Sequence, residues 1–171
     1  MDRSRFGFTI LIAFVFVFAM VVIGINSSYS IDEAETFKWE VSFENIDIVG
    51  GSISKYDEPT LVNRSSSVKD ISFEVSEKGD TINYKINSLN KGNVDAKVTA
   101  ILVTGATCGN KACSDLDYSL VYEDGNPVKK GDILKANSGK NIYLKFKYDG
   151  DVNEPITVKD INVSINYAVE G

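Results

Sequence analysis

The sequence predicts an all-β protein: a single antiparallel β-sandwich, immunoglobulin-like or jelly-roll, that follows one N-terminal transmembrane or signal helix. Three observations lead to this prediction. They are one long apolar run near the start, a two-residue alternation of apolar and polar side chains from residue 39 onward, and turn-forming residues between the alternating segments. Residues 39–171 show no helical apolar period, and a chain of that length can bury one hydrophobic core.

The apolar run spans residues 6–25, and Thr9 is its only polar side chain. Twenty residues in a helix reach about 30 Å, the thickness of the hydrocarbon core of a bilayer. In lipid only a helix satisfies its own backbone groups, so we expect a transmembrane helix. Arg3 and Arg5 precede the run and acidic residues follow it. This asymmetry predicts a cytoplasmic N-terminus, residues 1–5, and an extracellular C-terminal domain.

Three fates of this helix stay open. An uncleaved signal anchor is favoured, because the apolar part of a cleaved signal usually has only about 7–15 residues. Cleavage after Ser30 would release a secreted protein, since Ser28 and Ser30 have the small side chains that signal peptidase prefers. Cleavage after Gly7 would resemble prepilin processing, although Ile12 occupies the position where pilins carry a glutamate. Residues 26–38 are polar and are expected to form a stalk.

The exported domain is predicted to span residues 39–171. Its alternating segments are residues 39–44, 71–76, 82–87, 116–122, 142–148 and 161–169. Such alternation is typical of half-buried antiparallel strands. Trp39 shares the phase of Val41 and Phe43, so the sequence predicts that it packs in the core, clear of the membrane. Residues 94–103 end in an apolar run and predict a central strand whose far end is covered on both faces.

Cys108 and Cys113 are the only cysteines, and a Gly-Asn turn dipeptide lies between them. In an exported domain they are expected to form a structural disulfide. The alternatives are a redox pair or a two-thiolate metal site, but redox pairs are usually separated by two residues and no further ligand is visible. The sequence therefore predicts a disulfide that stiffens one loop.

The composition excludes several classes of site. Without histidine there is no Ser-His-Asp triad, Cys-His dyad or imidazole metal site. A formal net charge of -6 argues against a nucleic-acid partner, which requires a basic face. We therefore expect no catalytic residue, no cofactor and no metal. Two alternatives for the acidic turns, Glu123-Asp124 and residues 149–154, are a calcium site and a glycosidase-type carboxylate pair.

Four segments carry a resemblance to known proteins. They read WEVSFENI at 39–46, NKGNVDAKV at 90–98, DILKA at 132–136 and VSINY at 163–167. Together they resemble a group of uncharacterised exported β-sandwich proteins of Gram-positive bacteria. The second segment is also similar, more distantly, to one in the camelysin and TasA group of secreted β-sandwich proteins associated with biofilm fibres. The resemblance implies an exported all-β protein that assembles, but no protease, because the chain has no HExxH motif.

These observations favour a single-pass protein of the cell membrane whose extracellular domain binds or assembles at the cell surface and is not an enzyme. Its expected partners are the bilayer, through residues 6–25, and a second copy or a surface protein or glycan. The alternative is a secreted or pilin-like fibre subunit, released after Ser30 or Gly7, that polymerises by strand addition. A hydrolase that uses carboxylates alone is the least favoured reading.

Overall fold

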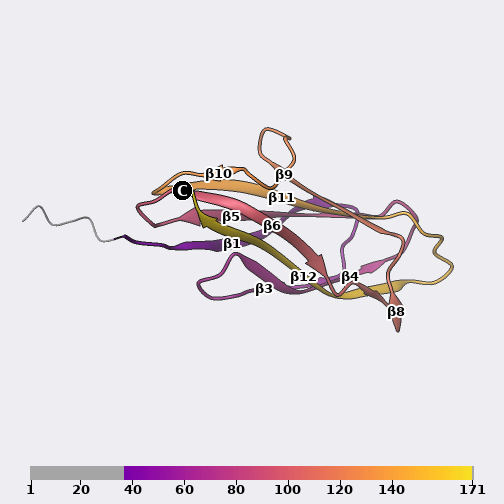
Figure 1. Ribbon diagram of the computed structural model, residues 1–171. Coiled ribbons are helices and arrows are strands. Elements are labelled where there is room, and N and C mark those ends of the chain that lie inside the picture. Colours follow the sequence, from indigo (N-terminus) through magenta and orange to yellow (C-terminus); the bar gives the residue numbers. More distant parts are fainter. Residues whose placement is uncertain (1–36, 171) are drawn as a thin grey trace, which may run out of the picture. The chain divides into compact units, whose positions relative to one another are not determined.

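The computed structural model describes residues 37–170, and every regular element in that range is a β-strand (Figure 1). The all-β prediction is confirmed for these residues. The predicted helix at 6–25, most of the stalk, and the cleavage positions Gly7 and Ser30 lie outside them. Between residues 37 and 170 no helix is long and apolar enough to cross a bilayer. The strands are β1 (Val41–Gly51), β2 (Tyr56–Asp57), β3 (Thr60–Leu61), β4 (Ser67–Val75), β5 (Thr81–Asn90), β6 (Ala96–Thr104), β7 (Thr107–Cys108), β8 (Lys111–Ala112), β9 (Leu116–Tyr122), β10 (Ile133–Leu134), β11 (Ser138–Tyr148) and β12 (Ile156–Val169).

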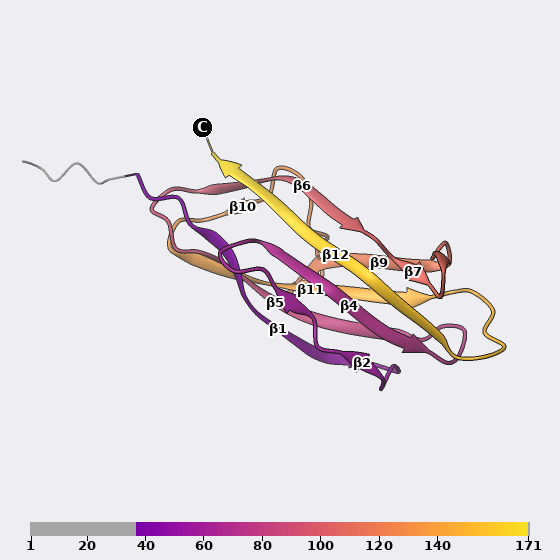
Figure 2. The same ribbon diagram turned by 90° about the horizontal axis from the view of Figure 1, so that it is seen from below.

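The strands form two antiparallel sheets that make up a sandwich (Figures 1 and 2). One sheet has the order β1-β5-β11-β9, and the other has the order β10-β6-β12-β4-β2. In the second sheet β3 also pairs with β4, and the short β7–β8 hairpin extends from β12. The two last long strands, β11 and β12, therefore lie inside their sheets, each between strands that come earlier in the chain.

The hydrophobic core lies between the sheets, where the predicted alternation is confirmed for the central strands. Every second residue of β5 is buried, and the same holds for β11 from Ile142 to Tyr148. Phe73 of β4 meets Phe146 of β11 across the sandwich with ring centroids 5.6 Å apart. Phe146 and Tyr84 also form an edge-to-face pair with ring centroids 6.3 Å apart. The alternate residues that point inward from the strands thus form one core of aromatic and aliphatic side chains.

Trp39 does not pack in the core, contrary to the prediction from its phase. Its side chain is 39% exposed, and it precedes β1, which begins at Val41. Val41 pairs with Asn90, the last residue of β5, so Trp39 extends past the end of the neighbouring strand. The alternation of apolar and polar residues could not reveal that Trp39 is exposed, because the alternation continues beyond the last residue of the neighbouring strand.

The far end of β6 is not covered on both faces, which corrects a second prediction. Leu102 is 48% exposed. The strand has β12 on one side, but β10 covers its other side only at Ala96 and Lys97 and through the adjoining turn. Within the apolar run Ile101 and Val103 pack against the core while Leu102 is exposed on the other face, so only one face of this end of β6 is covered.

Two further side chains on the expected inward phase are exposed. Tyr118 is 52% exposed, because β9 is the outermost strand of its sheet and only Leu120 in it is buried. Val169 is 41% exposed at the last position of β12. Both exceptions lie at the rim of the sandwich.

Candidate functional site

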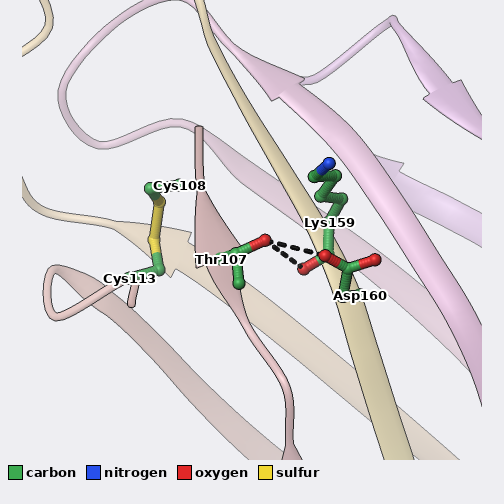
Figure 3. The surroundings of a disulfide bond; sticks show 5 residues. All are labelled: Thr107, Cys108, Cys113, Lys159 and Asp160. Atoms are coloured by element: carbon green, nitrogen blue, oxygen red, sulfur yellow. Dashed lines mark hydrogen bonds between the residues drawn. A yellow bond between two sulfur atoms is a disulfide. The ribbon is translucent and has the colours of Figure 1, made fainter. Parts of the chain in front are cut away.

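The predicted disulfide is confirmed between Cys108 of β7 and Cys113, just after β8 (Figure 3). It closes a small hairpin that is fixed to β12, because Cys108 pairs with Val158. The Thr107 hydroxyl donates to a carboxylate oxygen of Asp160 at 2.9 Å and to the Lys159 carbonyl oxygen at 3.4 Å (Figure 3). The cysteines therefore stiffen one end of the second sheet.

Replacing both Cys108 and Cys113 by serine is expected to lower the free energy of unfolding by about 2 kcal/mol, because the closed loop is short. Urea unfolding of the oxidised protein and the double variant measures this difference. The variant should still unfold in one transition, since Cys108 and Cys113 are only partly buried where they pack against the core. Alkylation of both cysteines of the exported protein without reductant would contradict a structural disulfide.

The structure does not bring the acidic turns together. Glu123 and Asp124 follow β9 at the end where Tyr122 pairs with Ile142. Residues 149–154 follow β11 at the opposite end of the same strand pair. The length of β9, seven residues, separates the two turns by about 20 Å. Between residues 37 and 170 no group of three or more His, Cys, Asp or Glu side chains could hold a metal ion.

The most distinctive surface feature is a gap in the pairing of β6. At one end of the gap the Val98 N–H donates to the Asp132 carbonyl oxygen at 2.9 Å. At the other end the Ala106 carbonyl oxygen accepts from the Cys113 N–H at 3.1 Å. Between these points, within the described chain, no segment pairs with the outer side of residues 99–105. We call this stretch the β6 window.

The direction of the backbone in the β6 window follows from the neighbouring strand. The Ile165 N–H of β12 donates to the Ser66 carbonyl oxygen at 3.0 Å, on the side away from β6. Ile165 pairs with Ile101, so these two residues form a pair without hydrogen bonds between them. The N–H and C=O groups of Ile101, and by alternation those of Val103, therefore point outward from the sheet edge.

The β6 window has no charged side chain and no proline to protect it, although its pairing with β12 shifts register at one end, between Asn166 and Tyr167. Residues 98–108 carry no charged side chain, and neither do residues 161–169 on neighbouring β12. Leu102 is half exposed, with Ser164 opposite it on β12. Proteins commonly protect such edges with lysine, proline, bulges or covering loops. The β6 window is therefore able to accept an extended chain.

The edge strands of the other sheet are paired from outside over only part of their length, at Phe43 of β1 and at residues 120–122 of β9. On β1 the Phe43 N–H donates to the Ser65 carbonyl oxygen at 3.0 Å. On β9 Val121 bridges to Pro127, and the Val128 N–H donates to the Leu120 carbonyl oxygen at 3.0 Å. Sequence reasoning missed the β6 window because pairing is a tertiary property. The only signal for it was the uncharged run at 98–108.

Comparison with protein-family models gives no match, and no curated protein or solved structure is significantly similar to the chain.

Proposed function

We propose that the chain is a single-pass membrane protein with a cytoplasmic N-terminus, whose extracellular β-sandwich binds or assembles at the cell surface without catalysis. The β6 window is the observation that carries this proposal. The apolar run at 6–25 and its charged flanks support the membrane tether. The disulfide supports an oxidising compartment outside the cytoplasm.

Strand addition is the mode of binding that the β6 window supports best. An extended segment beside residues 99–105 would form up to four main-chain hydrogen bonds, two each with Ile101 and Val103. It would also cover Leu102. Because the neighbouring side chains are uncharged, the favoured occupant is a short uncharged segment rich in β-branched residues. The covered ends at Val98 and Ala106 limit its length to about the length of the window.

Six carboxyl groups between residues 37 and 170 have a pKa that is shifted, and all six shifts are downward. The pKa values of Glu40, Glu44, Asp80, Asp95, Asp124 and Asp149 are all lowered. For Asp95 the main cause is the hydrogen bond from Lys135, followed by the N–H of Ala136. A glycosidase needs one carboxylic acid whose pKa is raised. The lowered pKa values instead favour carboxylates that accept hydrogen bonds within turns and form ion pairs.

The strand order supports a jelly-roll rather than an immunoglobulin-like connection. Each consecutive long strand from β1 through β4, β5 and β6 to β9 changes sheet. The late strands then enter between earlier ones, β11 between β5 and β9 and β12 between β4 and β6. Immunoglobulin-like sandwiches instead begin with two neighbouring strands in the same sheet.

A fibre or biofilm-matrix subunit is the second candidate, because the β6 window could accept a strand from a neighbouring copy. The resemblance to the camelysin and TasA group agrees with this alternative. The intact mass of the native protein separates the candidates. A chain that begins at Met1 supports the anchored form, and chains that begin at Phe8 or Ile31 support the pilin-like and secreted forms.

Replacing Leu102 by lysine is expected to reduce strand addition about tenfold, or about 1.4 kcal/mol, since a lysine at a sheet edge opposes pairing and the apolar contact of Leu102 with the added strand is lost. The measurement is chemical cross-linking on intact cells that express the full chain. Val49→Lys is the matched control, because Val49 is 49% exposed on β1 and Leu102 is 48% exposed on β6. Equal cross-linking of both variants and the native protein would remove the β6 window as the binding site.

A further inference from the structure

A second surface lies at the end of the sandwich where the described chain begins and ends, which we call the terminal end (Figures 1 and 2). Lys38 and Asn93 exchange two hydrogen bonds, from the Lys38 N–H to Asn93 Oδ1 at 2.8 Å and from the Asn93 N–H to the Lys38 carbonyl oxygen at 3.1 Å. The Glu170 N–H donates to the Asp95 carbonyl oxygen at 3.0 Å. One loop, between β5 and β6, therefore holds both terminal segments.

The terminal end exposes three large apolar side chains. Phe37 is 63% exposed, Trp39 is 39% exposed and Val169 is 41% exposed. Tryptophan is enriched where a protein meets the headgroup region of a bilayer, because its ring prefers lipid and its N–H prefers water, and Phe37 and Val169 add apolar surface beside it. Exposed apolar side chains at this position thus fit a lipid surface better than they fit bulk water.

Trp39 also lines two adjoining clefts. One is bounded by Glu40 and Ser42, and the other by Ser66 and Tyr167. Arg64 borders both. The Arg64 guanidinium can donate hydrogen bonds to phosphate oxygens, and the Trp39 indole offers an apolar ring. A phospholipid surface presents both phosphate groups and apolar chains.

The charges of the terminal end do not oppose an approach to lipid, although the chain as a whole carries -6. Three of its carboxylates are paired with lysines: Lys38–Glu40 at 3.0 Å, Lys91–Glu44 at 2.9 Å and Lys135–Asp95 at 2.6 Å. The hydrogen bond from Lys38 is the main cause that lowers the pKa of Glu40. Arg64 and Lys97 add two cations against the carboxylate of Glu170, so these side chains together carry no excess of negative charge, whereas the tether at 26–36 adds Asp32, Glu33 and Glu35.

We infer that the terminal end rests on the outer surface of the bilayer, with Trp39 at the level of the lipid headgroups. The inference rests on the proposed membrane tether. The predicted span ends at Ile25, and the eleven residues 26–36 join it to Phe37. That length reaches about 16 Å as a helix and at most about 40 Å fully extended, so the tether allows this end of the sandwich to contact the membrane. The occupant of the apolar surface is the bilayer that the chain itself spans.

Bromine-labelled lipids test the position of Trp39 directly, because it is the only tryptophan. The full chain is placed in vesicles of phosphatidylcholine and phosphatidylglycerol with bromine near the headgroup or deep in the acyl chains. We expect blue-shifted Trp39 emission that is quenched more strongly by shallow bromine than by deep bromine. The orientation of the chain in the vesicle does not matter, since the domain faces a bilayer surface in either case.

A matched control moves the tryptophan to the other end of the sandwich. In the Trp39→Phe, Tyr118→Trp variant the only tryptophan is at position 118. Tyr118 is 52% exposed, and it lies level with the far end of β1. Val41 and Gly51 bound β1, whose ten steps span about 33 Å. The emission of this variant should be unaffected by either lipid. Phe37→Ser with Val169→Ser should weaken the quenching of Trp39.

Flotation of the same vesicles separates the two proposals. If the chain floats with lipid but Trp39 is quenched no more than the control tryptophan, the terminal end does not contact the bilayer and the tether still stands. A chain that stays behind in the dense fraction contradicts the tether and this inference together. Flotation with shallow quenching confined to Trp39 supports both.

Discussion

Replacing Phe146 by alanine is expected to lower the free energy of unfolding by about 3–5 kcal/mol, the cost of removing a buried aromatic side chain and leaving a cavity. Phe146 is 1% exposed and belongs to β11, inside its sheet. Its ring contacts Phe73 of the opposite sheet at a centroid distance of 5.6 Å and Tyr84 of the neighbouring strand at 6.3 Å. Its loss would separate the two sheets at the centre of the core.

Urea unfolding followed by circular dichroism measures this loss. Lys145→Ala is the matched control, because Lys145 precedes Phe146 on β11 and its side chain points to solvent. The control should change the stability by less than about 0.5 kcal/mol. Similar effects of the two substitutions would mean that the sheets do not pack as described.

Asn90→Ala is expected to cost about 3 kcal/mol, the largest effect among the polar residues, because it leaves several buried groups without partners. Asn90 is fully buried at the end of β5. Its amide group donates to the carbonyl oxygens of Val94 at 2.8 Å and Leu134 at 3.2 Å. Its carbonyl oxygen accepts from the Gly92 N–H at 3.0 Å. One side chain therefore fixes the β5–β6 loop and links it to β10.

The control for Asn90 is another asparagine of the same strand. Asn87 is only half buried, and its amide donates to Asn141 at 3.2 Å. Asn87→Ala should cost about 1 kcal/mol, as for one hydrogen bond on the surface. Hydrogen exchange should show faster exchange in the loop at 91–95 for the Asn90 variant only. Equal stability of the two variants would refute this role of Asn90.

The sequence predicted the central strands and the disulfide because both depend on local information. The phase of Ile82, Tyr84 and Ile86 needs only the neighbouring residues, and the two cysteines have no other partners in the chain. The β6 window and the exposure of Trp39 depend on where neighbouring strands end. Asn90 ends β5 and leaves Trp39 without a neighbouring strand, and β10 is too short to cover β6. Such limits are set by pairing between distant segments, which a single sequence does not show.

The order in which the strands emerge during synthesis has a consequence for the proposed export of the domain. Neither sheet can be completed before residues 138–169 are available, because β11 and β12 supply strands that lie within both sheets. Contacts between residues so far apart in the chain form slowly, and an unfinished sheet is unstable. We therefore expect the nascent chain to stay unfolded while it passes through the translocation channel, and to fold only after its C-terminus has reached the outside. If the domain is exported as proposed, the central position of the late strands would keep the chain unfolded until it has crossed the membrane.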